Sequence, residues 1–287
     1  MLKRLLFAVA LALIAASPAG AKPPVWVVRD ADSTIVLFGS VHLLPPGLDW
    51  RPAELDAALK DADDLWFELP VDPAASNRAA RIVSMQGRLP EGQRLSDKLS
   101  LLGRGRLKRA VERLHLSQPA IERMRPWLAE VTLGVAQLAA SGANASDGVE
   151  RAIAADAPDS AKRHAFETPE QQVAFFAGAP EKDQLASLEN SLRQMEGDPG
   201  AYAKLIDAWM AGDLRRLERR GVRPMRRAAP GLYRSLMVER NAVWTDTLIE
   251  RLAGSGETVV VVGAAHLVGK DGVPAMLRAR GIAVEGP

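Results

Sequence analysis

A run of four consecutive valines near the end of the chain most constrains its fold. Residues 258–262 form an unbroken apolar segment that stops at Gly263. A strand with one face in water alternates apolar and polar residues, whereas a continuous apolar run is typical of a strand covered on both faces. The segment therefore predicts a central strand in a sheet that has helices on both sides.

Further strand patterns lie at both ends of the chain. Two apolar runs around a polar turn predict a β-hairpin over 25–38, and residues 64–70 predict a short strand. A helix with regularly spaced apolar side chains is expected over 51–63, between these strands. A helix and a last short strand at 282–284 are expected after the valine run.

The middle of the chain has mostly helical patterns. Within 73–253, the segment 160–172 is expected to be a brief strand that enters a helix, with a capping box at Thr168. A longer helix is expected over 230–253, with Val243 on its apolar stripe.

The fold class that follows is α/β with some α+β character. We expect a central mixed sheet built from both chain ends, with a large helical insertion over about 73–253. No repeat of the solenoid kind interrupts this pattern, so residues 22–287 are expected to form a single domain.

Residues 1–21 have the features of a secretory signal peptide. Two basic residues precede an apolar stretch at 5–16, and the small residues 19–21 form a cleavage site of the Ala-x-Ala kind. The apolar stretch is shorter than the roughly 20 residues that a membrane span needs. We therefore expect cleavage after Ala21, no stable membrane span in the mature protein, and a periplasmic location.

Composition excludes several classes of function. Without residues 1–21 the acidic and basic residues balance, so a nucleic-acid partner is not expected. The basic runs at 104–113 and 215–227 have helical spacing and are interpreted as solvated helix faces. Because the chain has no cysteine, disulfides, thiol catalysis and thiolate metal sites are excluded.

Two of the four histidines end the same four-residue motif, Gly-x-x-His. His42 follows Gly39 after one apolar run, and His266 follows Gly263 after the valine run. A lone histidine at a strand end is more often a structural residue than a ligand. Because the carboxyl ends of parallel strands form the crevice where ligands bind, the pair instead favours a shared site. The two glycines allow sharp turns and close backbone approach.

Glu68 is the third candidate for that site. It is flanked by apolar residues, and burial of its carboxylate without a partner would be costly. The alternative is that Glu68 is a surface charge on an edge strand. Two imidazoles and a carboxylate suit Zn, Mn, Co or Fe, and such a metal lowers the pKa of bound water to roughly 7.

Three more polar residues are candidates for the surroundings of that site. Glu167 is a possible base, fourth ligand or orienting acceptor, or simply an acid at a helix N-terminus. His164, on the short strand that precedes Glu167, is kept as a lesser candidate. Arg240 is expected to face inward, where it either fixes Glu68 or Glu167 or holds a substrate anion.

With these residues identified, the chain resembles proteins of the TraB/GumN family, which are akin to Tiki-type metalloproteases and the erythromycin-esterase-like group. The resemblance covers nearly the whole mature chain, although residues 147–164 match the family pattern only loosely. It rests on the following segments: LFGSVHLLPP, LWFELP, FETPEQQ, VERNAVW and VVGAAHLVGKDGVPAMLRARG.

The resemblance implies a metal-dependent hydrolase, with Mn or Co as the favoured metal and Zn as another. By position it implies His42, Glu68 and His266 as the metal site. The matched segments place further residues around that site: Glu167, Arg240, Asn241, Ser40 and Trp244.

We therefore expect an exported peptidase that acts on a peptide or small-molecule substrate. One alternative is a protein that binds and sequesters a peptide without turnover. Another is an esterase or lactone hydrolase that uses the same site, because an activated water serves both kinds of bond.

Overall fold

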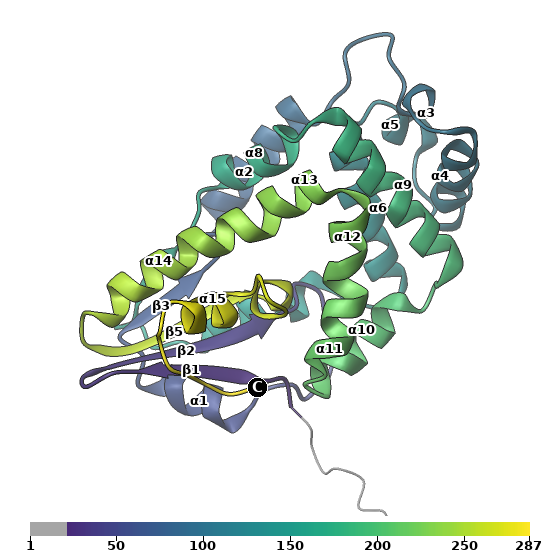
Figure 1. Ribbon diagram of the computed structural model, residues 1–287. Coiled ribbons are helices and arrows are strands. Elements are labelled where there is room, and N and C mark those ends of the chain that lie inside the picture. Colours follow the sequence, from purple (N-terminus) through teal and green to yellow (C-terminus); the bar gives the residue numbers. More distant parts are fainter. Residues whose placement is uncertain (1–21) are drawn as a thin grey trace, which may run out of the picture.

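The computed structural model describes residues 22–287. It is a mixed α/β structure in which one sheet is covered by helices and a helical region extends beyond it (Figure 1). The signal peptide expected over 1–21 lies outside the described residues. Within 22–287, no helix is long and apolar enough to cross a membrane.

The sheet has six strands in the order β4-β3-β5-β2-β1-β6, so the valine run is central, as expected. β5 pairs in parallel with β2 and β3, and β3 pairs in parallel with β4. β1 runs antiparallel to β2, as the expected hairpin, and to β6. The strands are Val25–Arg29 (β1), Ser33–Ser40 (β2), Asp64–Phe67 (β3), Lys162–Ala165 (β4), Gly256–Gly263 (β5) and Val284–Glu285 (β6).

Helices fill most of the remaining chain, and the capping box at Thr168 is present at the start of α8. The α-helices are Ala53–Lys60 (α1), Pro73–Gln86 (α2), Leu95–Lys98 (α3), Leu101–Arg113 (α4), Gln118–Glu122 (α5), Pro126–Ala140 (α6), Val149–Asp156 (α7), Pro169–Ala177 (α8), Glu181–Gly197 (α9), Ala201–Met210 (α10), Leu214–Leu217 (α11), Arg223–Ala228 (α12), Pro230–Tyr233 (α13), Arg240–Leu252 (α14) and Val273–Ala279 (α15). Short 3-10 helices cover Ala145–Asp147 (η1) and Ala264–Leu267 (η4), and π-helices cover Glu218–Val222 (η2) and Arg234–Glu239 (η3).

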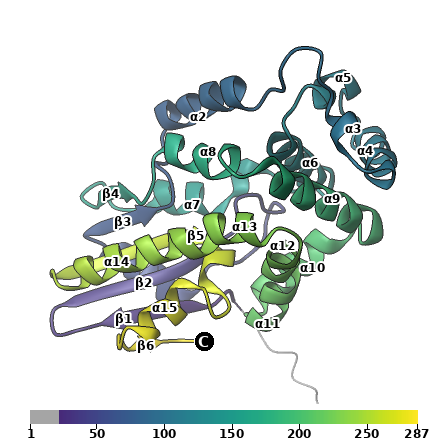
Figure 2. The ribbon, with the colours of Figure 1, turned by 45° about the horizontal axis from the view of Figure 1, so that its top comes forward.

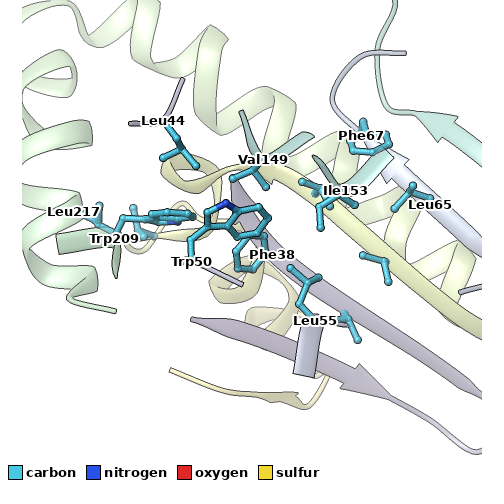
Figure 3. Packing of buried hydrophobic residues seen from close by; sticks show 14 of the residues in the cluster. Phe38, Leu44, Trp50, Leu55, Leu65, Phe67, Val149, Ile153, Trp209 and Leu217 are labelled. Carbon is cyan, nitrogen blue, oxygen red and sulfur yellow. The ribbon is translucent and has the colours of Figure 1, made fainter. Parts of the chain in front are cut away.

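Both faces of the sheet are covered, which accounts for the unbroken valine run. Val259 and Val261 belong to a core on the side of α1, where Phe38, Trp50 and Trp209 pack together (Figure 3). The alternate valines of β5 belong to a second core with residues of α14 and α15. A third core lies under α4, α6 and α9, away from the sheet (Figure 2).

The helix expected over 230–253 is interrupted by the π-helix η3. Val243, expected on its apolar stripe, is 60 % exposed, whereas Asn241, Trp244 and Thr245 are buried. A π-helix closes its hydrogen bonds over five residues instead of four. The π-helix shifts the following residues about the helix axis, so the spacing of a regular helix misplaces Val243, whereas Leu232, Leu236 and Leu248 of the same expected stripe are buried.

Candidate active site

Three candidate residues follow neighbouring strands at the carboxyl end of the sheet. His42, Glu68 and His266 follow the ends of β2, β3 and β5 within three residues, and these three strands are parallel neighbours. β3 lies between β4 and β5, and the Glu68 side chain is only 12 % exposed. Glu68 is therefore not a surface charge on an edge strand.

Each of the two glycines permits a close approach. A Cβ atom at Gly39 would lie 3.0 Å from the backbone Cα of Ala264. The backbone N–H of Gly263 donates to Glu68 Oε1 at 2.7 Å, and a Cβ atom there would lie 3.0 Å from the same oxygen. Neither glycine has a positive φ angle. Their role is to make room rather than to reverse the chain.

Arg240 links the two buried carboxylates. Its Nε donates to Glu167 Oε1 at 2.6 Å, and its Nη2 donates to Glu167 Oε2 at 3.0 Å and to Glu68 Oε2 at 2.8 Å. Its Nη1 donates to the backbone oxygen of Leu236. The guanidinium also lies over the ring of Trp244, whose indole N–H donates to Glu167. Of the two roles expected for Arg240, these contacts match the one in which it fixes the carboxylates.

The surroundings of Glu68 keep it ionised. Burial would raise the pKa of its carboxyl group, but electrostatic interactions with His266, Arg240 and His42 and the hydrogen bond from Gly263 lower this pKa to about 2. The site therefore holds a fixed negative charge at neutral pH. One oxygen of that charge lies 3.8 Å from Nε2 of His266.

His266 is buried and neutral. Asn241 Nδ2 donates to the backbone oxygen of Asp271 at 2.7 Å, which turns Asn241 Oδ1 toward the ring, 2.5 Å from Nδ1 of His266. The ring proton therefore sits on Nδ1, and Nε2 keeps its lone pair, 3.2 Å from Nη1 of Arg240. Burial, only partly offset by Glu68, lowers the pKa of His266 to about 4.

His42 has a different partner, Glu150, which the sequence analysis did not identify. Nδ1 of His42 lies 2.6 Å from Oε1 of Glu150, and the hydroxyl of Ser40 donates to the same oxygen at 2.5 Å. Burial of the ring nitrogen opposes its charge, but Glu150 outweighs this effect and raises the pKa of His42 to about 9. The ring side chain is nevertheless 64 % exposed, so its free edge is accessible.

The donor chemistry at this edge suits a divalent metal. Both imidazoles have Nδ1 held by a side-chain oxygen, an arrangement that fixes ring orientation when Nε2 is a metal ligand. Within residues 22–287, however, no group of three or more His, Asp or Glu side chains is gathered closely enough to hold an ion. His42 is turned to Glu150, and Arg240 lies beside Nε2 of His266.

His164 lies apart from these residues. Its Nε2 is 2.8 Å from Asp64 Oδ1, and its ring stacks on Trp66 with centroids 4.6 Å apart. Arg251 pairs with the other oxygen of Asp64 at 2.7 Å. These contacts form a separate ionic cluster at the opposite end of β3 from Glu68.

An apolar cavity of about 360 Å³ opens beside His42. Its wall includes Leu205, Ile206 and Trp209 from α10, together with Val268. Ser40, His42 and Gly263 are part of the same wall, so the cavity borders the ends of β2 and β5. Cavities of this size, apolar with a few polar groups, are typical of ligand sites.

Comparison with known proteins places the chain in a family. The model of the TraB/PrgY/gumN family matches residues 24–286. The chain belongs to this family. It is 26 % identical over 243 residues to the uncharacterized protein YbaP of Escherichia coli (strain K12), covering 84 % of this chain and 87 % of YbaP. YbaP of Shigella flexneri matches to the same extent. No solved structure matches the chain.

Proposed function

We propose that this TraB/PrgY/gumN family protein is a metal-dependent hydrolase that cleaves peptide bonds next to an apolar side chain. One observation carries the proposal: two histidines with oriented rings and a buried carboxylate follow adjacent parallel strands beside an apolar cavity. Hydrolases need an activated water and a binding surface within reach of each other.

His42, Glu68 and His266 would hold the metal. When bound, a divalent ion would supply Lewis acidity that lowers the pKa of water to about 7. The resemblance noted from the sequence favours Mn or Co, and neutral imidazole with carboxylate also suits Zn.

The remaining residues position these three. Glu150 orients His42, and Asn241 orients His266. Arg240 and the N–H of Gly263 each hold one oxygen of Glu68. The apolar cavity beside His42 would shield a bound substrate side chain from water. This contact would fix which peptide bond of the substrate lies at the site.

Cleavage of a peptide library by the purified protein tests this function, with Mn²⁺, Co²⁺ or Zn²⁺ and with chelator. We expect metal-dependent cleavage beside apolar residues, which is lost in a His42→Ala, His266→Ala double variant. His115→Ala is the matched control, because His115 is exposed at the end of α4.

Three other outcomes would contradict the proposal. Cleavage no greater than that of the double variant would refute an enzyme. Stoichiometric peptide binding in calorimetry, unaffected by chelator and without cleavage, would indicate sequestration. Turnover of ester but not peptide substrates would indicate an esterase.

We also propose that the protein is exported to the periplasm, as the pattern of residues 1–21 suggests. Amino-terminal sequencing of protein from a periplasmic extract tests this. A mature terminus at Lys22 is expected, and retention of residues 1–21 in the cytoplasm would contradict export.

A further inference from the structure

A second, larger cavity of about 620 Å³ is lined by five arginines. Its lining residues come from α9, α10 and the segment that contains η2 and α12. From its helical spacing, the basic run at 215–227 was expected to form a solvated helix face. Four arginines of this run line the cavity together with one other, and the full set is Arg193, Arg219, Arg220, Arg223 and Arg227.

The positive charge of this cavity is not balanced by protein carboxylates. Asp198 is the acidic residue in its wall, and it already pairs with Lys204 at 2.6 Å and with Arg220 at 3.1 Å. Among residues 22–287, the guanidinium groups of Arg219, Arg223 and Arg227 form no ion pair. Like charges that line one cavity repel one another, so a bound anion would stabilise the arrangement.

Two of the arginines also have buried donors without partners. The Nε atoms of Arg220 and Arg223 are inaccessible to solvent, and no acceptor lies within hydrogen-bonding distance of either among the described residues. A buried donor left without an acceptor is costly, and native proteins rarely retain one without a reason. The π-helix η2, which carries Arg219 and Arg220, is also of a kind often found at functional sites.

We propose that this cavity binds a small anion that carries two or more phosphate groups. Guanidinium groups bind phosphate oxygens in pairs, in a planar fork. A phosphate group brings a charge of about −1.5 to −2, so two of them balance the uncompensated arginines better than two carboxylates do. The inference does not depend on the hydrolase proposal. The cavity is separate from the one beside His42, although Leu205 contributes to the walls of both.

Calorimetric titration of the full-length protein with inorganic pyrophosphate tests this site, with citrate and inorganic phosphate as comparison ligands. We expect one pyrophosphate per chain, tighter binding than for either comparison ligand, and weaker binding as the salt concentration rises. An Arg223→Gln, Arg227→Gln double variant removes two charged donors and is expected to weaken binding at least about tenfold.

The matched control is Arg215→Gln, Arg216→Gln, which removes two charges from the same basic run but from outside the cavity wall. It is expected to change the affinity less than about twofold. Arg219→Gln, at an exposed position, serves as a second test if the double variant does not fold. Equal loss in the control and the cavity variants, preference for citrate, or no pyrophosphate binding at low salt would overturn the proposal.

Discussion

Replacement of Arg240 by methionine is the sharpest test of how the candidate site is held together. Arg240 is 6 % exposed and donates three hydrogen bonds to the carboxylates of Glu167 and Glu68. Methionine fills similar apolar space beside Trp244 but supplies no donor and no charge. Two buried carboxylates then share one site without a cation between them.

We expect the Arg240→Met variant to lose about 3–5 kcal/mol of unfolding free energy, the usual cost of removing one partner of a buried ion pair. Urea unfolding followed by circular dichroism measures this loss. The matched control is Arg29→Met, because the Arg29–Glu285 pair has side chains that are 50 % and 68 % exposed. Exposed pairs contribute about 0–1 kcal/mol, so the control is expected to be close to wild type.

A second substitution separates lost charge pairing from lost packing. Glu167→Gln alone is expected to destabilise the protein, because it weakens the contact with Arg240. In the Arg240→Met background, Glu167→Gln removes an uncompensated charge. The double variant should therefore lose less unfolding free energy than the sum of the two single losses, by about 0.5–3 kcal/mol. Additive losses, or an Arg240→Met variant no less stable than Arg29→Met, would refute the account of Arg240 as the link between the carboxylates.

Three further predictions concern the sheet and its flanking helix, each measured by urea unfolding. Gly39→Ala places a Cβ atom 3.0 Å from the Cα of Ala264 and should lower the free energy of unfolding by about 1–3 kcal/mol. An unchanged urea midpoint would contradict this prediction. Burial raises the pKa of the Asp64 carboxyl group, but His164 and Arg251 outweigh burial and lower this pKa below 3.8. The wild type should therefore be more stable than Asp64→Asn at pH 7, and this difference in stability should close as the pH falls below 3.8. A difference in stability that does not depend on pH would contradict this prediction. Trp244→Ala should lower the free energy of unfolding by about 3–5 kcal/mol, because Trp244 is buried. Val243→Ala should lower it by less than about 0.5 kcal/mol, because Val243 is exposed. Similar losses for the two variants would contradict the rotation of α14 by η3.

The fold was largely predictable because its signals are local. The valine run indicates a strand covered on both faces, and β5 is central with cores on both sides. Periodicity and capping residues likewise mark α1 and the start of α8. The π-helix η3 was not predictable, since no residue type marks hydrogen bonds closed over five residues.

The candidate site was predictable only where its residues follow strands. His42, Glu68 and His266 were identified because each stands at a strand end, and topology alone brings such positions together. Glu150 was missed because it lies in an ordinary amphipathic helix, 108 residues along the chain from the histidine that it contacts. A contact of that kind has no signature in the local sequence.

The two Gly-x-x-His segments have the same frame but place their histidines in opposite environments, and the element after each glycine explains the difference. β5 continues into the 3-10 helix η4, which carries His266 inward against Asn241 and Trp244. β2 ends at Ser40 and leads into a loop, so His42 remains at the rim of the apolar cavity beside Glu150. The buried ring is kept neutral by burial, and the accessible ring is kept cationic by a carboxylate. Identical motifs on parallel strands therefore provide one fixed nitrogen lone pair, at His266, and one ring, at His42, that must release a proton before it can hold the metal proposed above.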